Sequence, residues 1–418
     1  MRWESLMNDK MYRLWVIFLL TAGTFINAVD RASLSVAAPV IIKDLLLDPA
    51  LMGIVLSAFF WPYALLNVPA GSLADKFGSK KVLGWSVAVW SVFSAITGLA
   101  RNFYSLLFAR IGVGVGEAAA FPVIAKVVAG NFPSEERGTA VGVIWAGVRL
   151  GMAVTPVLMA FLILNYGWQN AFFITGLGSL MWCGLWYFGF KDKSESSQPR
   201  ETKDRVPIPW KQIMASRATV GLIVTKFFQD YLLYFFLTWI PAYLVMERGF
   251  SIIKMGIYAS LPWLAAFIAQ PIIGWLSDKL MKSGMSVTKA RKSVIIGLQV
   301  SAASVMGVGF INDPIVAIGL LTFSIAAEAG AGSLIWAIMT ELAPKKLAGS
   351  LGGIMNTAGA IAGILSPAIT GFIVKFTGSF QLALLAGGVM LLIAALAVLV
   401  IIPELKPIEF KQEKVIVA

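Results

Sequence analysis

The 418-residue chain contains no histidine and a single cysteine, and only 13% of its residues are charged. The lack of histidine excludes histidine metal ligands and histidine proton relays, and the lone Cys183 cannot form an intrachain disulfide. Soluble domains carry about 25% charged residues, whereas here 58% of the residues are hydrophobic and the mean hydropathy is +0.80. This composition indicates an integral, multi-pass protein of the lipid bilayer.

Polar and turn residues divide the sequence into apolar segments of about 20 residues or more, long enough to cross a hydrocarbon core of roughly 30 Å as α-helix. The segments are 13–38, 51–74, 80–100, 104–129, 138–164, 168–189, 218–245, 253–277, 292–311, 315–340, 348–374 and 380–402. The first is too long for the apolar part of a signal peptide, and we expect it to stay in the mature protein. The sequence therefore predicts an all-α membrane protein with twelve transmembrane helices.

The net charge of +12 follows from membrane topology rather than from nucleic-acid binding, and no nucleic-acid partner is expected. With both termini on one side, the polar stretches on that side contain 24 Lys and Arg residues and those on the other side contain five. Cytoplasmic loops carry the excess of basic residues. We therefore expect both termini in the cytoplasm and the chain in the inner (cytoplasmic) membrane of the cell.

The longest polar stretch, residues 191–212, divides the segments into two sets of six. Its serine, proline and charged residues predict a flexible linker. We expect an N-terminal six-helix bundle over 1–190, a cytoplasmic linker over 191–216, a C-terminal six-helix bundle over 217–403 and a cytoplasmic tail over 404–418.

The two halves also share sequence patterns. The pattern G-x-L-A/S-D-K occurs at residues 71–76 and 274–279, between the second and third segments of each half. Residues 133–138 of the first half likewise match residues 344–349 of the second half. A repeat with both halves in one membrane orientation is one of two repeat classes found in secondary transporters.

The loop at residues 71–81, with Asp75 and Lys76 in it, resembles the signature loop of the major facilitator superfamily. The resemblance covers the whole chain. It implies two six-helix bundles that rock about a central site to give alternating access, in a protein that functions as a monomer. It also implies a gating role for Asp75 and Lys76, which would brace the cytoplasmic ends of helices.

Ionisable residues inside the apolar segments need a reason, because each costs about 2.5 to 3.5 kcal/mol at the centre of a membrane helix. These residues are Asp30, Arg31, Arg110, Glu117, Lys126, Arg149, Lys226, Asp230 and Glu328. Two readings are open for them, a functional site or structural ion pairs that hold the bundles together. Arg110 and Glu117 share a helix face two turns apart, and the i,i+4 spacing of Lys226 and Asp230 lets them pair.

A closer resemblance is to the anion:cation symporter family, whose bacterial members include sugar-acid carriers of the D-galactonate and hexuronate type. Residues 27–39 resemble its first-helix motif, Arg110-x6-Glu117 its fourth-helix pair and residues 227–243 its seventh helix. The resemblance implies that Arg31 and Arg110 bind a carboxylate and that Asp30 and Glu117 carry protons. The residues implied to line the substrate pocket are Tyr63, Gln229, Trp336 and Asn356.

Two residues depart from that pattern, namely Ala28, where a tyrosine is expected, and Arg149, where a glutamine-like residue is expected. Arg149 and Lys226 either indicate a dianionic substrate or pair with Glu328 and Asp230, and the sequence leaves both readings open.

A guanidinium matches a carboxylate bidentately. Burial favours the neutral form of a carboxyl group and a neighbouring arginine favours the charged form. A substrate that engages the arginine therefore promotes protonation of the adjacent carboxyl, and by linkage protonation favours anion binding. The sequence predicts proton-coupled symport of a small organic anion, with the proton gradient as the driving force and no cofactor.

Sodium-coupled anion or phosphate uptake is an open alternative, and drug efflux is a weaker one because cavity arginines repel a cationic drug. A receptor or a membrane enzyme is not expected, since the chain offers no nucleophile–base set.

Overall fold

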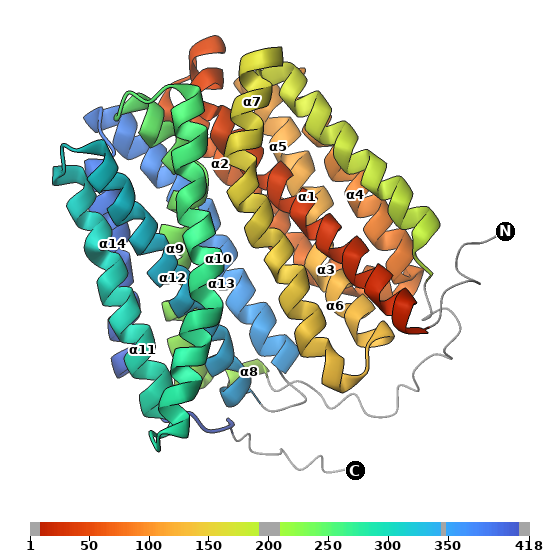
Figure 1. Ribbon diagram of the computed structural model, residues 1–418, viewed down its shortest axis with the longest axis vertical. Coiled ribbons are helices and arrows are strands. Elements are labelled where there is room, and N and C mark those ends of the chain that lie inside the picture. Colours follow the sequence, from red (N-terminus) through yellow and green to blue (C-terminus); the bar gives the residue numbers. More distant parts are fainter. Residues whose placement is uncertain (1–8, 192–209, 344–347, 409–418) are drawn as a thin grey trace.

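The computed structural model describes residues 9–191, 210–343 and 348–408. Its helices form two groups that lie side by side, coloured red to yellow and green to blue in Figure 1. The first group comprises α1 (Asp9–Asp44), α2 (Pro49–Ala58), α3 (Phe60–Phe77), α4 (Ser79–Thr97), α5 (Phe103–Glu117), α6 (Ala120–Asn131) and α7 (Ser134–Gly189). The second comprises α9 (Arg217–Met246), α10 (Ile252–Lys282), α11 (Val287–Ala302), η3 (Ala303–Phe310), α12 (Pro314–Leu342), α13 (Ala348–Thr377) and α14 (Gln381–Val400).

The short helix α8 (Trp210–Ala215) precedes the second group and occupies the end of the expected linker. The rest of that linker, 192–209, lies outside the described residues. The same holds for most of the expected tail, 409–418, and for residues 344–347 of the second sequence repeat.

Ten helical stretches among the described residues are long and apolar enough to cross a membrane, where α2 counts with the first turns of α3, α5 with α6, and α11 with η3. One of them, α7, has 56 residues and contains Gly167 with φ +80°, a conformation that breaks a helix, so its two parts correspond to the expected segments 138–164 and 168–189. The 19-residue α4, which corresponds to segment 80–100, is not among the ten. It nevertheless packs against α5 and α7.

Two expected segments are each divided into two helices. The break between α2 and α3 falls at Phe59, and that between α5 and α6 at Ala118. Each break lies about one turn before a proline, Pro62 or Pro122, which has no N–H to bond the carbonyl four residues earlier. Each pair nevertheless forms one stretch long enough to cross a membrane, 49–67 and 103–131, in line with the continuous segments expected from the sequence.

Glycines bring the helices of the first group into close contact. A Cβ at Gly112 would lie 2.1 Å from the Phe93 ring on α4, and one at Gly116 would lie 2.5 Å from the backbone of Trp90. On α7, a Cβ at Gly147 would lie 2.5 Å from the Thr21 carbonyl on α1. Small residues at these positions let the backbones approach, as is usual between membrane helices.

The two groups meet most closely at the end of the molecule where α1 ends and α2 begins. There the Asp48 carboxylate forms a 2.8 Å ion pair with Lys375 of α13. A Cβ on Gly53 of α2 would lie 2.6 Å from the Pro367 carbonyl of α13. Deeper in, the Ser35 hydroxyl donates to a carbonyl of α9 at 3.0 Å. This end is closed by direct backbone contact between the groups.

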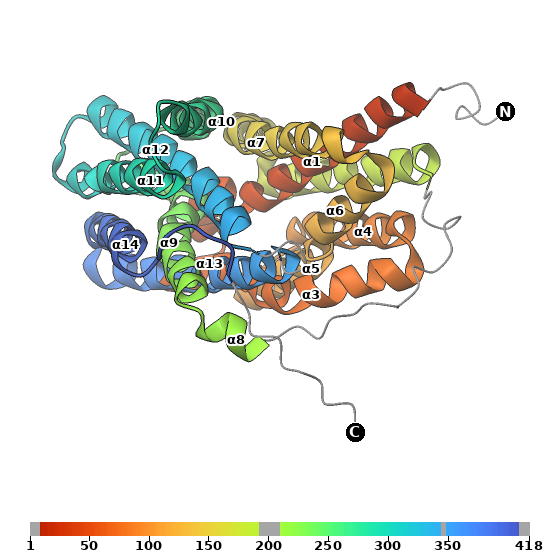
Figure 2. The same ribbon diagram turned by 90° about the horizontal axis from the view of Figure 1, so that it is seen from below.

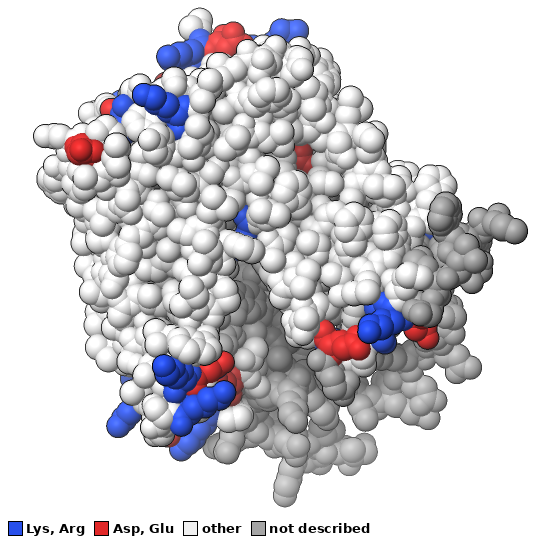
Figure 3. Space-filling model, viewed as in Figure 1, with Lys and Arg blue, Asp and Glu red and all other residues white. Residues whose placement is uncertain are grey.

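Figure 2 views the molecule from the opposite end, with the second group on the left, the first on the right and α8 below α9. The space-filling view is hollowed between the groups at that end (Figure 3). Charged side chains gather at the two ends of this face, and the belt between them is almost entirely uncharged (Figure 3). The molecule thus has one closed end and one open end, with an apolar surface around its middle.

Candidate functional site

A salt bridge between Arg31 of α1 and Glu117 of α5 forms the centre of the site. The guanidinium donates to one carboxylate oxygen, Oε2, through Nη2 at 2.8 Å and through Nε at 3.1 Å. The Glu117 side chain is fully buried, while the Arg31 side chain is 12% exposed. The other oxygen, Oε1 of Glu117, is also buried, and the Asn27 side chain interacts with this carboxylate.

Aromatic rings surround the Arg31 guanidinium. Its carbon lies 4.8 Å from the centre of the Phe59 ring and 5.0 Å from that of Tyr63, with Phe121 at 6.0 Å. Tyr234 of α9 packs edge-on against Phe60, with 4.5 Å between ring centres, so the second group contributes to the same wall. Aromatic faces stabilise a desolvated cation. The tyrosine hydroxyl groups in this wall can form hydrogen bonds with a polar ligand.

Arg110 lies beneath this pair and has no carboxylate partner among the described residues. Its Nη2 donates to the Arg31 carbonyl at 2.9 Å, and its guanidinium lies 5.2 Å from the Phe59 ring centre. The residue is 5% exposed, and its Nε is buried without a partner. A buried guanidinium without a counter-ion is energetically costly, so binding of an anion next to it is favourable.

Asp30 is adjacent to Arg31 in sequence but points in another direction, since successive helix residues are about 100° apart. Its carboxylate accepts hydrogen bonds from Ser94 of α4 at 2.8 Å and from Ser179 of α7 at 2.5 Å, and it is 1% exposed. The structure therefore brings Arg31, Arg110 and Glu117 together and holds Asp30 apart, inside the first group.

In the second group, Lys226 and Asp230 of α9 form an ion pair at 2.7 Å along their own helix. The Lys226 ammonium lies 5.9 Å from the centre of the Trp336 ring. Glycine at position 359 on α13 makes room for the pair, because a Cβ there would lie 2.2 Å from the Asp230 carboxylate.

Gln229 is directed into the second group rather than toward the cleft. Its amide nitrogen donates to the Glu328 carboxylate at 3.0 Å, and its amide oxygen accepts from Gln299 at 3.4 Å. The residue is 1% exposed. Of the other expected pocket residues, Trp336 is half-buried and Asn356 is exposed.

Arg149 links the two groups. From α7 its Nε donates to the Gln270 amide oxygen on α10 at 3.1 Å, and Gln270 donates in turn to the Ala329 carbonyl of α12 at 3.1 Å. Arg149 therefore bonds to Gln270 and not to Glu328, the partner considered from sequence.

The expected gating residues lie at the open end of the molecule. Asp75, at the end of α3, forms an ion pair with Lys126 of α6 at 2.9 Å. Lys76 lies 5.2 Å from the Phe77 ring. In the second copy of the pattern, Asp278 pairs with Arg291 of α11 at 3.1 Å, so each aspartate ties the end of one helix to another helix of its own group.

Four polar contributors were missed in the sequence, namely Ser94, Ser179, Tyr234 and Gln270. Hydroxyl and amide residues are common in membrane helices, and apart from the residues that the family resemblance implied, only charged residues were treated as signals. Of these four residues, Gln270 is the one that could have been noticed in the sequence, because it is a polar residue directly before Pro271 within an apolar segment.

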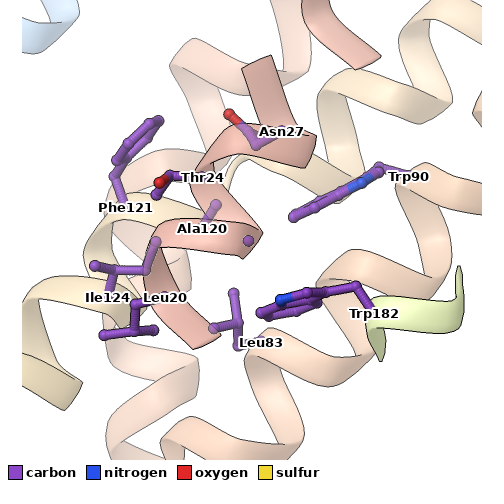
Figure 4. Close-up of a pocket in the computed structure, with 10 residues that line it drawn as sticks. Leu20, Thr24, Asn27, Leu83, Trp90, Ala120, Phe121, Ile124 and Trp182 are labelled. Atoms are coloured by element: carbon purple, nitrogen blue, oxygen red, sulfur yellow. The ribbon is translucent and has the colours of Figure 1, made fainter. Parts of the chain in front are cut away.

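A small pocket within the first group adjoins this site and shares Phe121 with it. It lies between α1, α4, α6 and the second part of α7, and Figure 4 shows Leu20, Leu83, Ile124 and the Trp182 ring around it. Its lining is almost entirely apolar, so it is unsuited to a carboxylate.

Two groups of membrane-crossing helices that enclose buried arginines and carboxylates define a secondary transporter. The comparison with known families agrees. Residues 20–367 match the Major Facilitator Superfamily, and the chain belongs to that family of transporters.

Individual relatives are described as transporters of sugar acids. The chain is 36% identical over 430 residues to the Escherichia coli (strain K12) protein described as "Probable galactarate/D-glucarate transporter GudP", covering 96% of this chain and 95% of that protein. It is 34% identical over 393 residues to the hexuronate transporter of Bacillus subtilis (strain 168), covering 92% and 93%. The crystal structure of a D-xylose-proton symporter has the same fold, with a TM-score of 0.80 at 16% identity over 96% of this chain and 100% of that one.

Proposed function

We propose that this transporter carries a small organic anion, a sugar acid or a related carboxylate, across the inner membrane together with protons. The observation that carries the proposal is the cluster of Arg31, Arg110 and Glu117, in which Arg31 pairs with the one carboxylate and Arg110 donates to the Arg31 carbonyl without a carboxylate partner among the described residues. A substrate carboxylate is the natural second anion of such a cluster. The relatives described as transporters of galactarate/D-glucarate and of hexuronate support this class of substrate.

Exchange of ion-pair partners supplies the coupling. When a substrate carboxylate engages Arg31, Glu117 loses the partner that favours its charged form and remains in a buried position. Protonation of Glu117 then becomes favourable. Reciprocally, a protonated Glu117 leaves Arg31 free for the anion, so proton binding and anion binding reinforce each other. Asp30, whose carboxylate accepts hydrogen bonds from the Ser94 and Ser179 hydroxyls, is the second proton carrier of the first group.

Alternating access follows from the two ends of the molecule. We propose twelve spans in two six-helix bundles, residues 1–190 and 217–403, with both termini in the cytoplasm. In this count α7 contributes two spans, while α2 with α3, α5 with α6, and α11 with η3 contribute one span each. In this orientation the end sealed by Asp48 and Lys375 is external and the open end is cytoplasmic. The bundles rock about the arginine cluster, and Asp75 and Lys76 act at the cytoplasmic end. The transporter functions as a monomer.

Purified protein in liposomes tests the proposal. We expect labelled galactarate, galactonate or a hexuronate to accumulate when a proton gradient, acidic on the side of entry, is imposed, and not when a sodium gradient replaces it. Arg110→Ala is expected to abolish this uptake, whereas Arg101→Ala, which removes an exposed charge from a loop, is expected to leave it intact. Uptake driven by sodium alone, or undiminished in Arg110→Ala, contradicts the proposal.

A further inference from the structure

Arg149 and Glu328 carry opposite charges on the two facing groups, and neither forms an ion pair among the described residues. The Arg149 guanidinium of α7 donates through Nε to the neutral amide of Gln270 at 3.1 Å. Glu328 of α12 is 2% exposed and accepts a hydrogen bond at Oε1 from Gln229 at 3.0 Å, while its buried Oε2 accepts none within the described part of the chain. A buried charge without a counter-ion is costly, so each of these groups is a suitable partner for the other.

A single side chain separates the two residues. Gln270 of α10 accepts from Arg149 and donates through its amide nitrogen to the carbonyl of Ala329, the residue next to Glu328, at 3.1 Å. The charge of Arg149 interacts electrostatically with Glu328 and with Asp230. Asp230 already has its ion pair along α9 at 2.7 Å. Glu328 is therefore the carboxylate that is available to Arg149.

Arg149 lies where the two groups begin to separate. Two helical turns further from the open end, the Pro156 carbonyl of α7 is so close to α10 that a Cβ on Gly256 would lie 2.8 Å from it. At the open end the surface is hollowed between the groups (Figure 3). Arg149 itself is half-buried, and its two terminal nitrogens form no hydrogen bond among the described residues. The guanidinium is therefore at the inner end of the open cleft, with donors that water can reach.

Closure of this cleft changes the surroundings of the guanidinium. Approach of the two groups displaces water from its terminal nitrogens, and a cation buried against neutral partners alone is unfavourable. A charge-assisted hydrogen bond to a carboxylate is about twice as strong as one to a neutral amide. Glu328 presents a free acceptor oxygen close to Gln270. Arg149 can therefore exchange the amide for the carboxylate by a change of side-chain rotamer.

We propose that Arg149 exchanges its partner during the transport cycle, from Gln270 when the cleft is open to Glu328 when it is closed, and that the Arg149–Glu328 ion pair stabilises the closed-cleft conformation. This inference rests on the proposed alternating access and adds the positioning residues that set the balance between its two conformations. Glu328 stays ionised in both conformations, so the protons remain on Glu117 and Asp30.

Distance measurements between spin labels test the exchange of partners. In a Cys183→Ala background, Thr139→Cys near the start of α7 and Lys282→Cys at the end of α10 place labels at exposed positions of the two groups, near the open end. A short distance between the labels reports the closed cleft, and a long distance reports the open one. The ratio of short to long distances is measured with and without galactarate.

Arg149→Gln and Glu328→Gln are each expected to lower this ratio about tenfold, the size expected for loss of one hydrogen bond to a charged group. The double variant is expected to lie no lower than either single variant, because one change already removes the pair. Gln270→Leu is expected to raise the ratio, since it removes the partner of Arg149 in the open conformation. Opposite shifts from neighbouring residues distinguish the exchange of partners from a general loss of stability.

Two matched controls are Arg101→Gln in an exposed loop and Glu341→Gln, which removes a carboxylate that pairs with Arg291 inside the second group at 3.2 Å. Both are expected to leave the ratio unchanged. An unchanged ratio in Glu328→Gln, falls that multiply in the double variant, or a lowered ratio in Gln270→Leu overturns the inference. If Glu328→Gln is not recovered as folded protein, Glu328→Asp shortens the side chain and keeps the charge, and an unchanged ratio in that variant overturns the inference equally.

Transport measurements separate this role from proton binding. In proteoliposomes, the slope of the logarithm of galactarate accumulation against the pH difference counts the coupled protons. Glu328→Gln is expected to slow uptake and to leave this slope unchanged, whereas a slope that falls by about one overturns the inference. A wild type that accumulates no sugar acid under a proton gradient contradicts the proposed function alone, since the distance ratios measured without galactarate still test the exchange of partners.

Discussion

Replacing Asp30 by asparagine separates the proton-carrying role of this residue from its structural one. Asn has nearly the same shape, and its amide can accept from one serine and donate to the other, so the hydrogen bonds with Ser94 and Ser179 can be retained. Each neutral hydrogen bond contributes about 0.5 to 1.5 kcal/mol. We therefore expect the variant to fold, with a loss of unfolding free energy of about 1 kcal/mol.

The loss in transport is far larger. One pH unit corresponds to about 1.36 kcal/mol per proton, a tenfold accumulation of substrate for each proton that is coupled. A variant that carries one proton fewer should therefore accumulate about tenfold less anion at a gradient of one pH unit, with the membrane potential clamped at zero. Exchange of labelled for unlabelled anion, which needs no net proton movement, should persist.

The assay compares steady-state accumulation and exchange in the same proteoliposomes at several pH gradients. The slope of the logarithm of accumulation against the pH difference counts the coupled protons, and in Asp30→Asn it should fall by about one. Ser94→Ala is the matched control, because it removes one hydrogen bond to the carboxylate and keeps the carboxyl group. An unchanged slope in Asp30→Asn, or an equal fall in Ser94→Ala, would refute the reasoning.

Three further predictions concern the ion pairs and the closed end. Glu117→Gln leaves Arg31 without its buried counter-ion, which costs about 3 to 5 kcal/mol. Thermal unfolding should therefore occur at a lower temperature, and a bound sugar acid should restore part of the lost stability. An unaltered unfolding temperature would contradict a stabilising Arg31–Glu117 pair. Gly53→Leu forces a side chain against a backbone carbonyl of α13 and should open the closed end. A cysteine introduced by Lys375→Cys should then be alkylated faster in the Gly53→Leu background than in the protein that keeps Gly53. Equal rates would show that the contact is not tight. Partial burial raises the pKa of Asp48, but hydrogen bonds from Lys375 and from a backbone amide lower the pKa by more than burial raises it. The net pKa therefore lies below the ordinary range. The ion pair stabilises the protein at neutral pH and is lost only as the pH falls through that lowered pKa. Asp48→Asn should accordingly lower the unfolding temperature slightly at pH 7, by the equivalent of about 0.2 to 1 kcal/mol, and the difference from wild type should vanish in strong acid rather than persist.

The fold could be predicted from sequence to a large extent because membrane helices are specified locally. Each segment needs only enough apolar residues to cross the bilayer, and the helix satisfies its own backbone hydrogen bonds. Membership of the major facilitator superfamily, expected from the loop that contains Asp75, is confirmed. The stretches 49–67 and 103–131 each form one candidate span, as the segments predict, with a local division between α2 and α3 and between α5 and α6. Pro62 and Pro122 are visible in the sequence, but a proline in a membrane helix can also be accommodated without a break, so the division itself could not be predicted.

The candidate site was only partly accessible to such reasoning. Lys226 and Asp230 could be paired because the i,i+4 spacing fixes their proximity along one helix. Gln229 is expected to line the substrate pocket, and nothing in the sequence indicated that its amide also bonds to Glu328. The rotation of α9 against α12 decides this direction, and no local rule gives it.

The sequence by itself determined which residues are charged within the membrane and that they fall on both halves of the chain. Only the tertiary structure decided which of them neutralise one another. Asp30 and Arg31 are adjacent in the chain, yet their side chains end in different surroundings, one among hydroxyl groups and one against Glu117. Pairing energy depends on distances of a few ångströms between different helices, and those distances are fixed by how glycines such as Gly116 and Gly147 let the helices pack. Composition therefore specifies the number of buried charges, and helix packing selects the few that remain free for a ligand.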